Sequence, residues 1–457
     1  MQGIPTVVLT RAEFVSVTRN AVAGVGLAPD IAMAVFPLAT FLVESDIGQV
    51  QRDADRFVDG LTRWRAPERL APDARPARIP IEGADPETAF ANFNALFLRR
   101  DWGDGLPLVP PTAARVEWIL QGSDLPPGTV IGKFLPRGGI VTIETLAVSL
   151  AMAGGRPEYL PVLKAAVEAI LDPALEHDGW QATSSSCYPA VIVSGPVARQ
   201  IRVNAGFGLV GPDPRHPAGA SIGRAIRLLQ QNVGGALPGT GTMAMYGGMR
   251  YTNAVFAEDE DGLPPGWAPF GAAHMGRAPG ANSVAVAVVS GATNIIRRGI
   301  GTETLEDEAT AGLLRIASYL KGQNANGFPA YGTGVPGILI LSRTIAAQMA
   351  SLGWTRPKIQ QFLWEHARIP IAELESSGLV EWMTRAGIEP PREDPWPITA
   401  RPEHIAIVVA GGSHPTHAYW LQASIAPVLT GAAITLPSNW DALVARGNED
   451  LGYGHDR

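Results

Sequence analysis

The chain alternates between short apolar runs and longer amphipathic segments, and this alternation limits the folds open to it. Residues 4–9 and 31–36 are short apolar runs typical of strands. Residues 11–25 and 46–61 follow them with helical periodicity, each with apolar residues on one face. Strands and helices in alternation are typical of a parallel sheet, so we predict an α/β fold. Residues 1–64 supply only two such strands and form a partial, flavodoxin-like α/β segment.

Composition divides the rest of the chain. Residues 65–100 include a stretch rich in proline and polar residues, which predicts a linker. Residues 101–430 then contain further strand and helix patterns, and we expect them to form one larger α/β body. Residues 431–457 have little periodic pattern, so we expect an extended tail.

The larger body contains a weak internal repeat. A helix over 158–171 precedes a strand and small polar turn over 189–201. A helix over 310–322 precedes a similar strand and turn over 336–348. Both segments have the order helix, loop, apolar strand, turn and helix, and this shared order indicates a duplicated unit.

Charge and composition exclude several classes of protein. The formal net charge is −7, and no basic block stands out, so we expect no nucleic-acid partner. No segment approaches the roughly 20 uninterrupted apolar residues of a membrane span, so we expect no membrane partner. The first residues lack a basic region and a processing site, which favours a cytoplasmic location. A single cysteine excludes an internal disulfide.

That cysteine, Cys187, follows three serines and precedes the apolar strand run that starts at Tyr188. A thiol in a turn at a strand end can serve as a nucleophile or a redox group, depending on its exposure and its thiolate character. Free cysteines are also common as small buried apolar residues. The sequence leaves both interpretations open, and we predict Cys187 as a candidate catalytic residue.

A second candidate lies where Gly154, Gly155 and Arg156 join two predicted helices. Exposed amides at a helix start, with a guanidinium beside them, suit a substrate carboxylate or phosphate. Glu158 and Tyr159 follow and can transfer protons. The alternative is a helix corner in which Arg156 pairs with Glu158 or another carboxylate.

A third candidate follows the last predicted strand, where two glycines lead to His414 and His417. A loop histidine suits a general base, because its pKa is near neutrality. Two imidazoles bind zinc only with further ligands, and the sequence identifies no complete set, so we predict no metal site and leave the cofactor unknown. A purely structural loop remains the alternative.

Two further segments carry candidate binding residues. Residues 206–211 match the glycine spacing of a dinucleotide site, but no strand leads into them and no helix opens at their end. We therefore expect a pocket-lining loop, with Asn204 and His216 as polar contacts. Arg368 ends a predicted helix, where it either binds substrate or stabilises the helix dipole.

Several of these segments together resemble the large component of the bacterial UGSC-type (seleno)protein family, named for a Sec/Cys-Gly-Ser-Cys motif. The resemblance rests on residues 104–112, 152–161, 181–183 with 191–196, 365–370 and 407–412. Residues 3–64 also resemble the second half of that family's small redox-motif domain. The motif itself is absent, and Gly155 stands where the family has cysteine.

The resemblance implies a link to thiol or selenol redox chemistry, and a small redox-motif subunit or a second copy of the chain as partner. We therefore expect an enzyme that acts on a small polar or anionic metabolite. A redox-independent hydrolase or lyase that uses histidine and arginine is the first alternative. A non-catalytic scaffold subunit is the second.

Overall fold

The computed structural model describes residues 5–24, 30–42, 45–65, 78–247, 254–296, 304–326, 334–385, 387, 389 and 392–453. The fold is α/β, as predicted. In the N-terminal segment, β1 (Val8–Arg11) and β2 (Met33–Phe36) pair in parallel and are connected through η1 (Ala12–Phe14) and α1 (Val15–Gly24). The helix predicted over 46–61 is divided into α2 (Gly48–Arg52) and α3 (Ala54–Thr62), because the backbone of Asp53 leaves the helical region between them.

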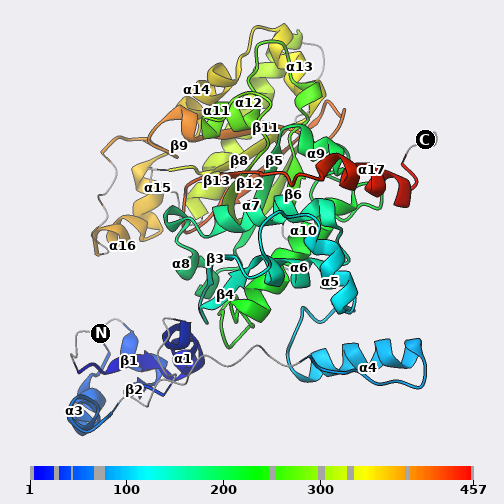
Figure 1. Ribbon diagram of the computed structural model, residues 1–457. Helices are drawn as coiled ribbons and strands as arrows, with labels where there is room; N and C mark the ends of the chain where they lie inside the picture. Colours follow the sequence, from blue (N-terminus) through cyan, green and yellow to red (C-terminus); the bar gives the residue numbers. More distant parts are fainter. Residues whose placement is uncertain are drawn as a thin grey trace.

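The larger body is built on a curled mixed sheet of seven strands within the described residues (Figure 1). Six strands follow the order β11-β8-β12-β7-β5-β6, and β13 also pairs with β7. Their bounds are β5 (Tyr188–Ser194), β6 (Ala254–Ala257), β7 (Ser283–Ile296), β8 (Gly337–Leu341), β11 (Ala406–Val409), β12 (His417–Ala423) and β13 (Thr430–Ala433). The strands β5 and β6 are parallel, as are β8 and β11, whereas β7 and β12 run antiparallel to their neighbours.

Two parts of the body have the same order of elements. In the first unit, α7 (Leu160–Ile170) precedes β5, and α9 (Pro196–Gln200) and α10 (Pro217–Leu228) connect β5 to β6. In the second, α12 (Leu305–Asn326) precedes β8, and α13 (Arg343–Ser351) and α14 (Arg356–His366) connect β8 to β11. This is the order of the repeat read in the sequence.

The two faces of the sheet contribute to different apolar clusters. Alternate residues of β5 point to opposite faces, so Val191 and Val193 pack with the helices of the first unit, while Ala190 and Ile192 join an inner cluster. In β8, too, alternate residues point to opposite faces. One set packs with the helices of the second unit, while Ile338 and Ile340 join the same inner cluster. Figure 1 shows α12, α13 and α14 on one side of the strands and α6, α7 and α10 on the other.

The remaining elements extend this body. They are α4 (Pro86–Arg99), α5 (Ala113–Leu120), β3 (Val130–Phe134), β4 (Gly139–Thr142), α6 (Ile143–Met152), η3 (Pro157–Tyr159), η4 (Pro173–Leu175), α8 (His177–Ala182), η5 (Leu229–Val233), η6 (Glu260–Gly262), α11 (Phe270–Met275), β9 (Arg368–Ile369), α15 (Ile371–Ser376), α16 (Leu379–Arg385), β10 (Trp396–Pro397), η7 (Pro402–His404) and α17 (Trp440–Asp450), with η2 (Leu38–Phe41) in the N-terminal segment. The described part of the chain contains no helix that is both long and apolar enough to cross a membrane.

The structure corrects two expectations about connecting segments. The region 65–100 is not a linker throughout, because α4 occupies 86–99 and the Asp85 side chain caps it by accepting from the Thr88 amide. Residues 431–457 are not an extended tail, because they contain β13 and α17. The buried residues Trp440, Leu443 and Gly447 recur at helical spacing, but three positions in a polar segment gave too weak a periodic pattern.

Candidate functional site

The carboxyl ends of four strands meet at one place in the body. The strand β6 ends beside β11, where the Asp259 amide donates to the Val409 carbonyl over 2.8 Å. A pocket of about 610 Å³, which we call the strand-end pocket, opens around this junction. Its lining includes Gly195 after β5, Glu258 after β6, Arg343 after β8 and Ser413 after β11. Strand ends of α/β folds are common binding places because loops diverge there.

A buried ion pair forms the base of this junction. The Glu258 carboxylate is fully buried, and its Oε1 accepts from Arg356 Nη2 over 3.1 Å and from the Val409 amide over 3.3 Å. Its Oε2 accepts from the Phe270 amide. Burial raises the pKa of Glu258 to about 7, although the Arg356 guanidinium opposes that shift. Through these hydrogen bonds Glu258 joins β6 to β11, α11 and α14. Both of its carboxylate oxygens are used in this way and do not face a ligand.

The acidic residues that follow Glu258 are also paired. Both Asp259 oxygens accept from Arg343, over 2.6 Å each. The Glu260 carboxylate accepts from the Gly195 amide over 2.7 Å, and Asp261 pairs with Arg199. These contacts fix the loop after β6 against the ends of β5 and β8, and they neutralise much of the charge on this wall.

The opposite wall carries a histidine–aspartate pair. The Nδ1 atom of His216 lies 2.8 Å from Asp213 Oδ2, and Asp213 Oδ1 accepts from the Arg215 amide over 2.9 Å. The hydrogen bond with His216 is the main cause that lowers the pKa of Asp213 to about 2. The carboxylate therefore stays ionised and holds the Nδ1 proton, so Nε2 is the nitrogen left for a ligand.

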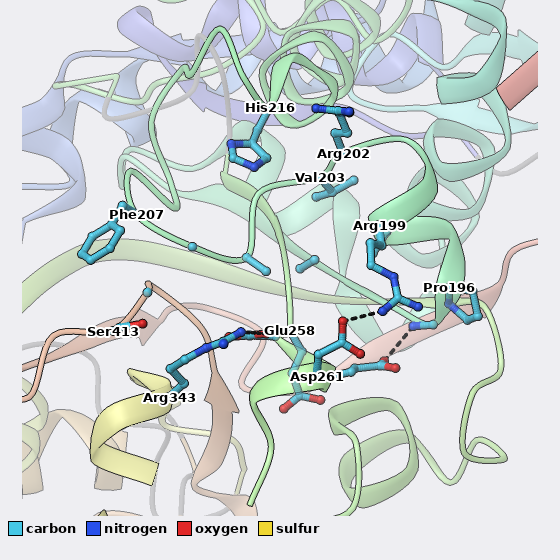
Figure 2. A pocket seen from close by; sticks show the side chains of 18 of the residues that line it. Pro196, Arg199, Arg202, Val203, Phe207, His216, Glu258, Asp261, Arg343 and Ser413 are labelled. Atoms are coloured by element: carbon cyan, nitrogen blue, oxygen red, sulfur yellow. Dashed lines mark hydrogen bonds and ion pairs between the residues drawn. The ribbon is translucent and has the colours of Figure 1, made fainter. Parts of the chain in front are cut away.

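Arg202 lies beside His216 on the same wall, as Figure 2 shows, with Arg343 and Asp261 across the pocket. Its guanidinium carbon is 3.1 Å from the centroid of the Tyr453 ring, and no carboxylate in the described part of the chain forms an ion pair with it. Its backbone has a φ of 60°, in the left-handed region that arginine rarely adopts. Such backbone strain is concentrated at functional sites. Arg202 thus places a positive charge on this wall that no ion pair within the described residues neutralises.

A second pocket of about 340 Å³, which we call the histidine pocket, adjoins the first at Gly206. His414 and His417 line it, with their Nδ1 atoms 3.3 Å apart. The predicted loop histidine therefore lies next to the strand-end pocket. Asn204 shapes the loop between the two pockets, because its side chain accepts from the Gly206 amide over 2.8 Å and donates to the Phe207 carbonyl over 2.9 Å.

Cys187 lies away from both pockets. Its side chain is fully buried at the amino end of β5, whereas the strand-end pocket opens at the carboxyl end. Its Sγ lies 3.3 Å from Ser185 Oγ and 3.4 Å from Ser424 Oγ. This environment favours the interpretation of a small packed residue, and the catalytic role of Cys187 stays a prediction.

The predicted corner at Arg156 forms a separate pocket of about 770 Å³, which includes Gly154, Gly155 and Tyr159. Arg156 Nε contacts Glu158 over 2.6 Å, and its Nη2 contacts Asp450 over 2.8 Å. Both Nε and Nη2 of the guanidinium therefore pair with carboxylates. This arrangement agrees with the alternative interpretation, in which Arg156 is part of a structural helix corner. Burial raises the pKa of Tyr159, which keeps its hydroxyl protonated.

Arg368 lies in neither pocket. Its Nη1 contacts Glu393 over 2.8 Å, and its guanidinium carbon is 4.3 Å from the Trp364 ring. The structure thus places His216 and His414 in two adjoining pockets, with Asn204 on the loop between them, and leaves the other candidates elsewhere. Among the described residues, no group of three or more histidine, cysteine, aspartate or glutamate side chains could hold a metal ion.

Sequence reasoning missed several residues of the strand-end pocket. Asp213, which contacts His216 but does not itself line the pocket, was the easiest signal to read, because an acidic residue three positions before a histidine can orient the imidazole. The run Glu258 to Asp261 was also visible, as four acidic residues directly after an apolar strand. Arg202 carried no signal, since its strained backbone is a property of the fold alone.

Comparisons with family models, with curated proteins and with solved structures found no match for this chain.

Proposed function

We propose that the chain is an enzyme that carries out acid–base chemistry on a small anionic metabolite in the strand-end pocket. The observation that carries the proposal is His216, oriented by Asp213, which lines the pocket beside Arg202, a cation that forms no ion pair within the described residues. An oriented imidazole next to an anion-binding group is a common arrangement for proton transfer.

In this mechanism each of the three residues has one task. The Asp213 carboxylate accepts a hydrogen bond from Nδ1–H of His216 and so fixes the tautomer in which Nε2 is unprotonated. Arg202 binds a carboxylate or phosphate of the substrate through its planar guanidinium. His216 Nε2 then takes a proton from the substrate or from a water molecule, and the resulting imidazolium is stabilised by the Asp213 carboxylate.

The position of Cys187 supports this reading over chemistry at a thiol of this chain. Cys187 is buried at the far end of β5, and the strand-end pocket contains no sulfur among its lining residues. The link to the UGSC-type family and its redox chemistry remains a separate proposal, in which another subunit would provide the thiol or selenol.

A ligand screen tests the anion-binding half of the proposal. Thermal shift with a panel of small carboxylates and phosphates should yield compounds that stabilise the native chain. Arg202→Met should abolish the stabilisation, whereas Arg385→Met, which removes an exposed arginine on α16, should leave it unchanged. Equal stabilisation of Arg202→Met by the same compounds would show that the anion binds elsewhere.

A further inference from the structure

We propose that the strand-end pocket and the histidine pocket are two parts of one binding site, whose ligand is an anion that carries an apolar group. The carboxylate or phosphate of this ligand lies in the strand-end pocket, so the inference rests on the proposed function. The apolar group lies in the histidine pocket. The shared boundary of the two pockets, the open space at that boundary and the difference in charge between them support this assignment.

The two pockets meet along three segments of the chain. Gly206 lines both of them. Ser342 lines the histidine pocket, and the next residue, Arg343, lines the strand-end pocket. Gly411 and Gly412 are divided between the pockets in the same way. Because neighbouring residues face different pockets at these places, the two pockets lie side by side along this boundary.

Glycines keep the boundary open. Within the described part of the chain, a Cβ added at Gly206 would meet only Asn204 Oδ1, at 3.8 Å, and one added at Gly411 would meet no atom within 4 Å. At Gly412 the boundary is narrower, because the Phe207 ring lies 3.0 Å from the place of an added Cβ. Phe207 also lines the strand-end pocket and is 60% exposed, so it offers an apolar surface beside the passage to the histidine pocket.

The two pockets differ in charge. Arg202 and several other arginine and acidic side chains line the strand-end pocket. None of the described residues that line the histidine pocket is aspartate, glutamate, lysine or arginine. Five of its lining residues are apolar, namely Leu209, Val210, Ile340, Ala410 and Ala418. Ligand pockets are mostly apolar, with a few polar groups that fix orientation, so this pair of pockets suits a ligand with one anionic end and an apolar remainder.

The polar side chains at the edge of the histidine pocket do not depend on a ligand. The hydroxyl of Thr416 lies 3.0 Å from His414 Nδ1 and 2.8 Å from His417 Nδ1, so these three side chains form a cluster of their own. The Ser342 hydroxyl donates to the His414 carbonyl. An apolar group can therefore fill the pocket without breaking these hydrogen bonds, which matters because unpaired buried polar groups are costly.

A series of straight-chain carboxylates tests the proposal. Acetate, butyrate, hexanoate and octanoate are titrated into the purified full chain, and the thermal shift gives a dissociation constant for each. Each methylene group that leaves water should tighten binding about fourfold. We therefore expect octanoate to bind at least about tenfold more tightly than butyrate.

Two glycine variants test where the alkyl chain lies. Gly206→Leu places a side chain in the open boundary, at a glycine whose φ is not in the left-handed region, and should bring the affinities for octanoate and butyrate close together. Gly179→Leu is the matched control, because Gly179 is exposed on α8, an added Cβ there has open space, and it lines neither pocket. It should keep the native ratio of affinities. If circular dichroism shows that Gly206→Leu is misfolded, Leu209→Ser replaces it, since it removes apolar surface from the histidine pocket.

Two results would overturn the inference. One is that octanoate binds the native chain no more tightly than butyrate does, or that neither binds. The other is a native ratio of affinities in both Gly206→Leu and Leu209→Ser. Arg202→Met separates this inference from the proposed function, because it should weaken butyrate and octanoate by the same factor and keep their ratio. Native affinity of Arg202→Met for both acids would contradict the proposed function and this inference with it, whereas a missing effect of chain length contradicts this inference alone.

Discussion

The replacement Arg356→Met is predicted to destabilise the body strongly, because it leaves the Glu258 carboxylate buried without its cation. Glu258 has no exposed side-chain surface, and Arg356 is only 5% exposed. Removing one partner of such a pair costs about 3–5 kcal/mol. Arg385→Met breaks the exposed pair with Glu381 and should cost at most about 0.5 kcal/mol, since exposed helix pairs contribute little.

The loss of stability in Arg356→Met should also depend on pH, and in a defined direction. The pKa of Glu258 is about 7 in the folded chain, above its ordinary value of 4.5, and loss of Arg356 raises it further. The folded state then holds a proton that the unfolded state has released, so stability falls as pH rises from about 4.5 through the folded pKa. The variant should therefore lose more stability at pH 8 than at pH 6.

Urea unfolding followed by tryptophan fluorescence measures this effect at the two pH values, because Trp267 lies 5.4 Å from the Arg356 guanidinium. The double variant Glu258→Gln with Arg356→Met should recover part of the loss, since no buried charge is left unpaired. A loss below about 1 kcal/mol for Arg356→Met at both pH values would refute the argument that this pair fastens β6 to β11.

Three further predictions concern single residues. Asp213→Asn should lower turnover by up to about 10⁴-fold with little change in substrate binding, because asparagine favours the wrong imidazole tautomer; kinetics of the variant on an identified substrate check this, and unchanged turnover would contradict it. Cys187 should resist iodoacetamide in the native chain and react only after denaturation, as mass spectrometry would show; rapid labelling of the folded chain would instead support a nucleophilic role. Gly412→Ala should disturb the strand-end pocket, since Gly412 has a φ of 86° and an added Cβ would lie 3.0 Å from the Phe207 ring; ligand-induced thermal shifts equal to those of the native chain would count against this contact.

Local sequence patterns predicted much of the architecture. The β-branched and apolar runs gave β1, β5, β8 and β11, because short buried strands have a compositional signal of their own. Thr112 caps α5 by accepting from the Arg115 amide, as a threonine directly before a helical run can. The capped helix α4 and the tail helix α17 were missed, because both lie in stretches where polar residues, proline or glycine obscure the periodicity.

The site was harder to predict because it depends on which strand ends come together. Cys187 and Gly195 lie at opposite ends of β5, and only the direction of that strand in the sheet decides which end faces a pocket. Arg156 has one local partner, Glu158, which the sequence offered as an alternative, but its second partner, Asp450, lies 294 positions away along the chain, where no local pattern could show it. His216 was identified as a polar contact, whereas its pairing with Asp213 was missed, although Asp213 lies only three positions earlier in the sequence.

Metabolite profiling tests the central claim most directly. The purified chain and His216→Ala are incubated separately with a cell metabolite extract, and the mixtures are compared by mass spectrometry with an extract that received no protein. The account predicts that the native chain consumes at least one anionic metabolite that persists with His216→Ala. Equal consumption by both proteins would contradict the role of His216, and no consumption by either would contradict the assignment of the chain as an enzyme for metabolites in that extract.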